Sequence, residues 1–425
     1  MKNLIYFTLF TFFILFKCSP ATFDSACNPN SSIFKSIYIS KVILGDKSSF
    51  CGISTTTFSN AGGGGNNGTT NTNPSNPIKQ PKFLLVPNNS SNTISVYTID
   101  ATSGVLTQIA GSPFSFPNLS SPRFISTHPS GLYVYVANGT GASVAGFSIN
   151  TTTGVLTSLG PAFTAPGNVY ALTINAGGNF LYAASYVGKV VYLYSINQTN
   201  GVLTYIQSFN ATSSAGGQTG ALFIDSTGNF MYTGNTDSPG IIDAFAINQS
   251  TGFLTLLGAP GPYIGLGNNA IAVTVDPFSR FVYAGYYSSN YISAFTMNAS
   301  TGALTQIAGS PFNTSGTSGT FITVEATGKF LYFANSGSAS ISGFTINSST
   351  GALTTIPGSP FAGTASPSVI YTDPTSSFLY CANTAASGSV SGYLINKTTG
   401  ALTQIAGSPW PTLGTNPFGV AFVSY

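Results

Sequence analysis

This chain carries very little charge. Its 425 residues include only 12 Lys and Arg and 9 Asp and Glu, or 5%, whereas ~25% of an average globular domain is charged. A protein that tracks nucleic-acid phosphates needs clustered Lys and Arg, and here these residues are few and scattered. The composition therefore excludes nucleic acid as a partner.

The residues of long helices and of familiar catalytic motifs are also lacking. Lys and Glu are too rare for a coiled coil, and 48 Gly with 24 Pro are too many for long helices. The sequence has one His, and no G-x-S-x-G elbow, Walker loop, H-E-x-x-H motif or Cys/His cluster. We therefore expect neither a cofactor nor a metal ion.

An export signal is predicted at the N-terminus. The apolar run from Leu4 to Phe16 is shorter than the ~20 residues of a membrane-spanning helix, but it is typical of a signal peptide. We expect residues 1–17 to be removed and Cys18 to become the acylated first residue of a bacterial lipoprotein, with cleavage after Ala21 as the alternative. The lipid would be the only membrane contact. The protein would lie in the cell envelope, on the outer membrane or in the periplasm, or it would be secreted.

Two further segments precede the folded domain. Residues 18–53 contain Cys27 and Cys51, which could close a disulfide loop in an oxidising compartment, and two free thiols are the alternative. Residues 54–81 are rich in Gly, Asn and Thr and predict a flexible linker. The folded domain is therefore expected to span residues 82–425.

An internal repeat determines the expected fold. A Gly-x-Leu-Thr pattern, preceded by Ser, Thr or Asn, recurs at intervals of 47 to 51 residues, with its glycine at Gly104, Gly154, Gly201, Gly252, Gly302, Gly351 and Gly400. Within each unit, aromatic and β-branched residues alternate with small polar ones in four short runs, which is the signal of four strands. Four-stranded units that repeat at ~50 residues predict an all-β, seven-bladed β-propeller of antiparallel blades.

The two ends of the domain predict how the ring closes. The first unit begins with a run that matches the second strand of the other units, at 82–86, and lacks a first strand. The last unit is followed by an extra run that matches a first strand, at 418–423. The C-terminal strand is therefore expected to complete the first blade and to leave no open sheet edge.

The single histidine and four of the nine acidic residues fall into one repeated turn position. This position follows the first strand of a unit and is occupied by His128, Asn175, Asp225, Asp276, Glu325 and Asp373. Asp and Asn in turns bind the backbone two residues on. We therefore interpret these residues, including the single histidine, as structural.

The repeat consensus, as in residues 276–305 followed by Gln306-Ile307-Ala308-Gly309-Ser310-Pro311-Phe312, resembles that of the lactonase-type seven-bladed propellers. This family includes the propeller type of 6-phosphogluconolactonase and carboxymuconate-cyclising enzymes. The resemblance covers essentially all of residues 82–425 and implies the propeller fold.

The resemblance also identifies departures from the pattern of the family enzymes. These enzymes tend to carry Pro-Arg-His at the start of a first strand and Asn-Glu at the end of the second strand. Here Arg123 is kept, while the His is replaced by Phe124 and the Glu by Gly139. Both missing groups are the ones that could move protons, so the resemblance implies the fold more strongly than the activity.

Two functions are therefore predicted. The first is an exported monomer that binds an unknown small molecule or protein without catalysis, through residues near the mouth of the channel. The candidates are Arg123, Tyr170, Tyr186, Tyr286, Trp410, Asn138, Asn335 and Asn383. The alternative for the Asn residues is that they only cap strand ends. The second function is a 6-phosphogluconolactonase-like lactone hydrolase, in which Arg123 polarises the carbonyl and a carboxylate such as Asp243 activates water.

Overall fold

The computed structural model describes residues 79–425, except 186–189, 212–218, 237–238, 258–262, 265–267, 364 and 386. The predictions for the signal peptide, Cys18, Cys27, Cys51 and the linker lie outside the described residues. A compact unit begins at Pro77 and continues to Tyr425. Within the described part of this unit, no helix is long and apolar enough to cross a bilayer.

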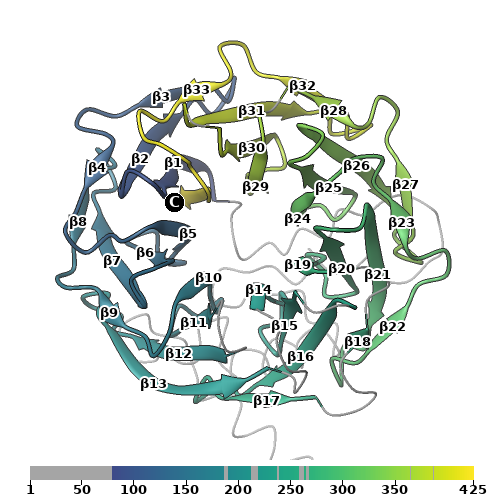
Figure 1. Cartoon of the computed structure of the whole chain (residues 1–425), viewed down its shortest axis with the longest axis horizontal. Coiled ribbons are helices and arrows are strands. Elements are labelled where there is room, and N and C mark those ends of the chain that lie inside the picture. Colours follow the sequence, from purple (N-terminus) through teal and green to yellow (C-terminus); the bar gives the residue numbers. More distant parts are fainter. Residues whose placement is uncertain are drawn as a thin grey trace, which may run out of the picture. The chain divides into compact units, whose positions relative to one another are not determined.

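Seven antiparallel sheets stand around a central axis, as predicted (Figure 1). We number the blades in chain order and name their strands from the axis outward. The inner strands of blades 1 to 7 are β34 (Ala421–Ser424), β5 (Pro122–Thr127), β10 (Val169–Ile174), β14 (Thr219–Ile224), β19 (Ala270–Val275), β24 (Gly319–Val324) and β29 (Pro367–Thr372). The second strands are β1 (Pro81–Asn88), β6 (Tyr133–Asn138), β11 (Phe180–Ser185), β15 (Phe230–Asn235), β20 (Phe281–Tyr286), β25 (Phe330–Asn335) and β30 (Phe378–Asn383).

The two remaining positions are also filled in every blade. The third strands are β2 (Thr93–Ile99), β7 (Ser143–Ile149), β12 (Val190–Ile196), β16 (Ile241–Ile247), β21 (Tyr291–Met297), β26 (Ser340–Ile346) and β31 (Ser389–Ile395). The outer strands are β3 (Leu106–Gln108), β8 (Leu156–Ser158), β13 (Leu203–Asn210), β17 (Leu254–Leu256), β22 (Leu304–Gln306), β27 (Leu353–Thr355) and β32 (Leu402–Gln404). We call the side that carries the links between second and third strands the mouth face.

Six blades have a short fifth strand that the repeat did not predict. It pairs with the third strand beyond the point where the outer strand ends, as β4 (Phe114–Ser115), β9 (Phe163–Thr164), β18 (Tyr263–Ile264), β23 (Phe312–Asn313), β28 (Phe361–Ala362) and β33 (Trp410–Pro411). In four blades, a Ser-Pro segment interrupts the outer edge. Its Ser hydroxyl accepts the N–H that the third strand would otherwise leave unpaired, as Ser112 does from Val96 at 2.8 Å.

The C-terminal strand closes the ring, as predicted. Strand β34 pairs with β1, and Leu85 lies opposite Ala421 while Phe83 lies opposite Val423. The strand begins at Ala421 rather than at Phe418. The preceding residues meet the end of β1 at an isolated bridge between Asn88 and Pro417, where the N–H of Phe418 donates to the carbonyl oxygen of Pro87 at 3.1 Å.

The repeated glycine is the residue that locks each blade to the one before it. Gly400 has a φ of +73°, and a Cβ there would lie 2.4 Å from the Phe330 ring of the preceding blade. The equivalent glycines of the other six blades also have positive φ and lie equally close to a Phe or Tyr of the preceding blade. Only glycine meets both demands. The glycine of the Gly-x-Leu-Thr repeat is therefore required by a contact between neighbouring blades.

The repeated turn position has the structural role that was predicted. The side chains of Asn175, Asp225, Asp276 and Asp373 each accept the backbone N–H that lies five residues on, at 2.6 to 2.9 Å. The ring of His128 lies within 3.0 Å of the carbonyl oxygen of Gly178 in the next blade. These residues stabilise turns on the side opposite the mouth face.

Candidate functional site

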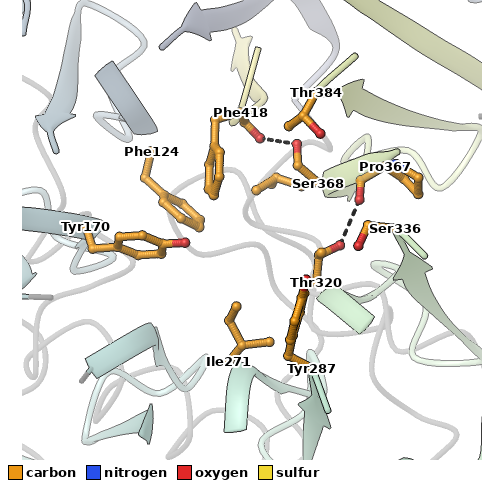
Figure 2. Close-up of a pocket in the computed structure, with 11 residues that line it drawn as sticks. Phe124, Tyr170, Ile271, Tyr287, Thr320, Ser336, Pro367, Ser368, Thr384 and Phe418 are labelled. Carbon is orange, nitrogen blue, oxygen red and sulfur yellow. Dashed lines mark hydrogen bonds between the residues drawn. The ribbon is translucent and has the colours of Figure 1, made fainter. Parts of the chain in front are cut away.

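A cavity of about 220 Å³ lies on the propeller axis at the mouth face (Figure 2). Aromatic side chains form one wall: Phe124 lies 5.7 Å from Tyr170 and 5.6 Å from Phe418 between ring centroids. Ile271 and Tyr287 lie across the cavity from them, and Tyr287 is 45% exposed. The cavity is therefore largely apolar and opens close to the mouth face.

The cavity is built from irregularities at the start of the inner strands. Six inner strands contain a register shift at their first residues, where one extra residue is inserted against the second strand. In three of these strands, the inserted residue is Tyr170, Ile271 or Thr320, and all three line the cavity. A β-bulge redirects a side chain that a regular strand would place elsewhere. Repetition of the bulge thus points side chains of successive blades at the axis.

Four Ser and Thr side chains add polarity to the cavity wall: Thr320, Ser336, Ser368 and Thr384. Thr320 Oγ1 donates to the carbonyl oxygen of Pro367 at 3.0 Å, and Ser368 Oγ donates to that of Phe418 at 2.7 Å (Figure 2). Each hydroxyl hydrogen is thus engaged by the backbone, while the hydroxyl oxygens keep acceptor capacity. These groups can receive a hydrogen bond from a ligand.

Arg123 lies beside this wall, on β5. Its guanidinium carbon is 4.8 Å from the Tyr170 ring centroid and 5.0 Å from that of Phe418. This is the range of cation–π attraction. Among the described residues, no side chain or carbonyl makes a hydrogen bond or ion pair with the guanidinium. The predicted residues Arg123 and Tyr170 are thus brought together.

Asp243 does not lie at the cavity. It is 1% exposed within β16 of blade 4 and accepts a hydrogen bond from the amide of Asn235. Sequence reasoning expected a buried Asp to meet either water or a donor, and Asn235 is that donor. The hydrolase hypothesis needs Asp243 and Arg123 in one site. The structure places them apart.

The strand-end amides lie inside the blades. Asn138, Asn335 and Asn383 are at most 1% exposed, and each donates to a serine of its third strand at 2.8 to 2.9 Å. Tyr286 takes the same place in blade 5 and donates to Ser293 at 3.0 Å, and burial raises the pKa of Tyr286 to about 12. These contacts fit the strand-capping alternative.

Trp410 and Tyr186 are the two remaining aromatic candidates. Trp410 lies on β33 at the outer edge of blade 7, rather than at the channel mouth where it was expected, because the segment after an outer strand pairs with the third strand. Tyr186 lies outside the described residues. Tyr287 and Phe418, which sequence reasoning did not select, line the cavity instead.

Gly139 is a site residue whose role was missed. A Cβ at this position would lie 2.9 Å from Arg123 Nε and 3.1 Å from the carbonyl oxygen of Ser121. The sequence indicated only that a Glu was absent here. The structure shows that the glycine makes room for the arginine side chain.

The fold and the axial cavity define a class, the closed seven-bladed propeller with a pocket at its mouth face. Residues 80–264 and 264–363 match the family described as Lactonase, 7-bladed beta-propeller. The chain belongs to this lactonase propeller family. Among curated proteins, no sequence matches it significantly.

Solved structures agree with this fold. A candidate 6-phosphogluconolactonase from Bacteroides fragilis has a TM-score of 0.69 at 18% identity, over 82% of this chain and 99% of its own. A candidate 6-phosphogluconolactonase from Bacteroides uniformis has a TM-score of 0.70 at 18% identity, over 81% of this chain and 100% of its own. The periplasmic gluconolactonase of Pseudomonas aeruginosa has a TM-score of 0.67 at 17% identity, over 80% and 98%.

Proposed function

We propose that this protein is an exported, lipid-anchored binding module that holds a small molecule in the axial cavity. The observation that carries this proposal is the composition of the cavity wall. Its lining residues are aromatic, aliphatic or hydroxylated, and the described ones include no carboxylate and no His. Such a wall can bind a ligand, but it offers no group with a pKa suited to proton transfer near neutral pH.

The size of the cavity limits the ligand. Drug-sized sites occupy ~300–1,000 Å³, and this cavity measures about 220 Å³. The ligand should therefore be small, with an apolar face against Phe124, Tyr170 and Phe418. Its donors would meet the oxygens of Thr320 and Ser368.

Lactone hydrolysis is the second candidate, because the chain belongs to a lactonase family and Arg123 lies beside the cavity. Arg123 could polarise a carbonyl there. General acid–base help is worth ~10²–10⁴ in rate, and Asp243 lies buried in blade 4, where it cannot activate a water in the cavity. A hydrolase would therefore have no general base among the described residues that line the cavity.

One experiment separates the two functions. Purified residues 77–425 are incubated with a panel of lactones, and both turnover and ligand binding are followed by NMR. We expect binding without turnover. Binding should be lost in Ile271→Trp, which fills the cavity, and kept in Leu394→Trp, which enlarges an exposed residue of β31. Turnover that Arg123→Ala abolishes would support the hydrolase and overturn the proposal.

A further inference from the structure

We infer that the outer strand of blade 3, β13, is a docking edge that pairs antiparallel with the same strand of a second copy of this chain. The inference concerns the outer rim of the ring rather than its axis, so it does not depend on what the axial cavity binds. It differs from the monomer that was expected from the sequence. The only partner that it requires is the protein itself.

The length of β13 distinguishes blade 3 from the other blades. The outer strands of the other six blades have three residues each, whereas β13 has eight and runs along the rim of the ring (Figure 1). It pairs with β12 over its whole length, from Leu203 opposite Ile196 to Asn210 opposite Val190. In the other blades, a loop and a short fifth strand replace the second half of this pairing. Blade 3 therefore presents the longest outer edge of the ring.

The edge of β13 lacks the residue that protects the outer edges of the other blades. A proline has no N–H and blocks the addition of a further strand. No proline follows β13 before Pro239. In each of the other six blades a proline follows the outer strand within five residues, as Pro113, Pro161, Pro260, Pro311, Pro360 and Pro409.

The outward backbone groups of β13 are available for pairing. The sheet of blade 3 ends with β13, and no described strand pairs with its outer side. Every second residue of such a strand directs its N–H and C=O away from the sheet. The strand keeps one protective feature, a bulge at Ile206, but residues 207–210 pair regularly with β12 beyond it. This stretch can therefore accept another strand.

The charge of the edge fits a second copy as the partner. When a strand pairs antiparallel with its own copy, a charge near the two-fold axis faces the same charge on the other copy, and such pairs are unfavourable. Native edges often carry Lys for this reason. No Lys, Arg, Asp or Glu lies between Lys189 and Asp225. Two copies of β13 can therefore meet without repulsion.

The position of the two-fold axis follows from the comparison of blades. Residues 206–210 have no counterpart in the three-residue outer strands, and their midpoint is Ser208, a small and exposed residue. An axis at Ser208 brings Tyr205 of one copy to the end of the other copy's β13, where Phe209 and Phe253 lie 6.0 Å apart between ring centroids.

The aromatic rings beside β13 supply the area that a strand pair lacks. Stable interfaces bury ~1,200–2,000 Å² in total, which is more than two short strands provide. Tyr205 is 42% exposed and Phe253 is 41% exposed, so both rings can be buried between the copies. Burial of this apolar surface would add to the backbone hydrogen bonds.

Charge variants at the axis test the inference. The dimer dissociation constant of residues 77–425 is measured by sedimentation equilibrium. We expect the wild-type domain to dimerise, and Ser208→Lys and Ser208→Asp each to raise the constant at least about tenfold, because like charges then face each other. An equimolar mixture of the two variants should associate again, because the facing charges are then opposite. Thr354→Lys places the same charge on the exposed part of β27 in blade 6 and should dimerise like the wild type.

A cysteine at the axis gives an independent measurement. Residues that lie opposite each other in an antiparallel pair have Cα atoms ~4.5–5.5 Å apart, within the reach of a disulfide. The one natural cysteine of residues 77–425, Cys381, is buried. With oxidised glutathione as the oxidant, Ser208→Cys should form a disulfide-linked dimer on non-reducing electrophoresis, and Thr354→Cys should not.

Several outcomes would overturn the inference: a wild-type domain that stays monomeric at every concentration reached, a dimer that persists in both charge variants, or a mixture of the variants that does not associate. An equal loss of dimer in Thr354→Lys would also overturn it, because the effect would not belong to β13. Circular dichroism confirms that each variant is folded. If the charge variants do not fold, the disulfide of Ser208→Cys decides, and its absence would contradict the pairing.

Discussion

The hydroxyl of Tyr380 donates a hydrogen bond to the carbonyl oxygen of Gly104 at 2.6 Å, and this bond joins the last blade to the first. The middle tyrosine of the second strand makes the same bond to the next blade at five other interfaces, from Tyr135, Tyr182, Tyr232, Tyr283 and Tyr332. Blade 1 has Leu85 at this position. The same hydrogen bond between neighbouring blades thus recurs around the ring. Tyr380 makes it between blade 7 and blade 1, where the ring closes.

Replacing Tyr380 with Phe should destabilise the propeller. Loss of one hydrogen bond costs ~1 kcal/mol, and a buried carbonyl left unpaired raises the cost to as much as ~3 kcal/mol. The free energy of unfolding would be measured by urea denaturation followed by circular dichroism. Tyr393→Phe is the matched control, because the buried hydroxyl of Tyr393 has no partner among the described residues. Its stability should be unchanged or slightly higher, and equal losses in both variants would contradict the role of the bond.

Deletion of residues 418–425 should open the ring. This deletion removes β34 and leaves the edge of β1 unpaired, because Leu84 and Leu85 lie opposite Phe422 and Ala421. An open edge also invites association with other chains. We expect a lower melting temperature and aggregation, measured by calorimetry and light scattering. A chain that lacks only Tyr425 keeps β34 and is the control. If the truncated chain melted no earlier than the full domain, ring closure by this strand would be wrong.

Gly400→Ala should be among the most damaging single substitutions. An alanine at φ +73° costs ~1–2 kcal/mol, and its Cβ would lie 2.4 Å from the Phe330 ring, which adds ~1–3 kcal/mol of overpacking. Gly358→Ala shares the positive φ, at +87°, but meets no atom closer than 3.7 Å. The difference between the two variants in urea denaturation measures the contact between blades. Equal losses would show that only the backbone matters.

The fold was predictable because its determinants are local and repeated. Each unit carries its own turn glycine, so seven blades and the closing strand could be counted from residue spacing. The fifth short strand was not predictable. In four of the six blades that have it, a serine hydroxyl replaces a backbone acceptor next to this strand, as Ser408 does for Gly392 at 2.9 Å, and the alternation of apolar residues does not predict such a contact.

The site was only partly predictable, because it depends on strand irregularities. Tyr170, one of the candidates, lines the cavity, and Arg123 lies beside it, because both residues stand near the start of inner strands. Tyr286 was chosen where Tyr287 lines the cavity, because successive residues of a strand point to opposite sides and an error of one residue exchanges them. Gly139 gave no signal, since a glycine that makes room for a neighbour resembles any other loop glycine.

The stability of the domain should fall in mildly acidic solution because of His128. The backbone N–H of Ser130 donates to Nδ1 at 3.1 Å, and Nε2 faces the Gly178 carbonyl oxygen at 3.0 Å, so the neutral ring satisfies both contacts. Burial, and to a smaller extent nearby Lys79, lower the pKa of His128, although the bond to Gly178 opposes this. The unfolded chain therefore binds a proton more readily. This contribution to stability is complete above pH ~6.5 and is lost as the pH falls through the lowered pKa.

The measurement compares urea midpoints at pH 7.5 and 5.5 for the wild-type protein and for His128→Asn. Asn occupies the same turn position at Asn175, where its side chain accepts the N–H of Phe180 at 2.9 Å. The chain has no other histidine, and histidine is the side chain whose unperturbed pKa lies in this pH range. We expect the wild-type midpoint to fall on acidification and that of His128→Asn to stay nearly constant. Parallel changes in both would assign the effect to other groups.

Replacing Leu413 should stabilise the propeller. Leu413 lies between β33 and β34 with a φ of +56° and 67% exposure. Bulky residues adopt this conformation at a cost. The loop between β23 and β24 has Ser315 at the matching place, also at +56°. Thr412 and Thr314 each bond to a carbonyl oxygen two residues on, at 3.0 and 3.3 Å, so the conformation is set by the loop and not by Leu413.

Leu413→Gly removes this backbone cost and an exposed apolar side chain, although glycine also increases the entropy of the unfolded chain. We expect a net gain of ~0.5–1 kcal/mol in the free energy of unfolding. Ser315→Gly is the matched control, because it tests the same φ without an apolar side chain, and it should give a similar gain. A loss of stability in Leu413→Gly, with a gain in Ser315→Gly, would show that the leucine makes a stabilising contact of its own.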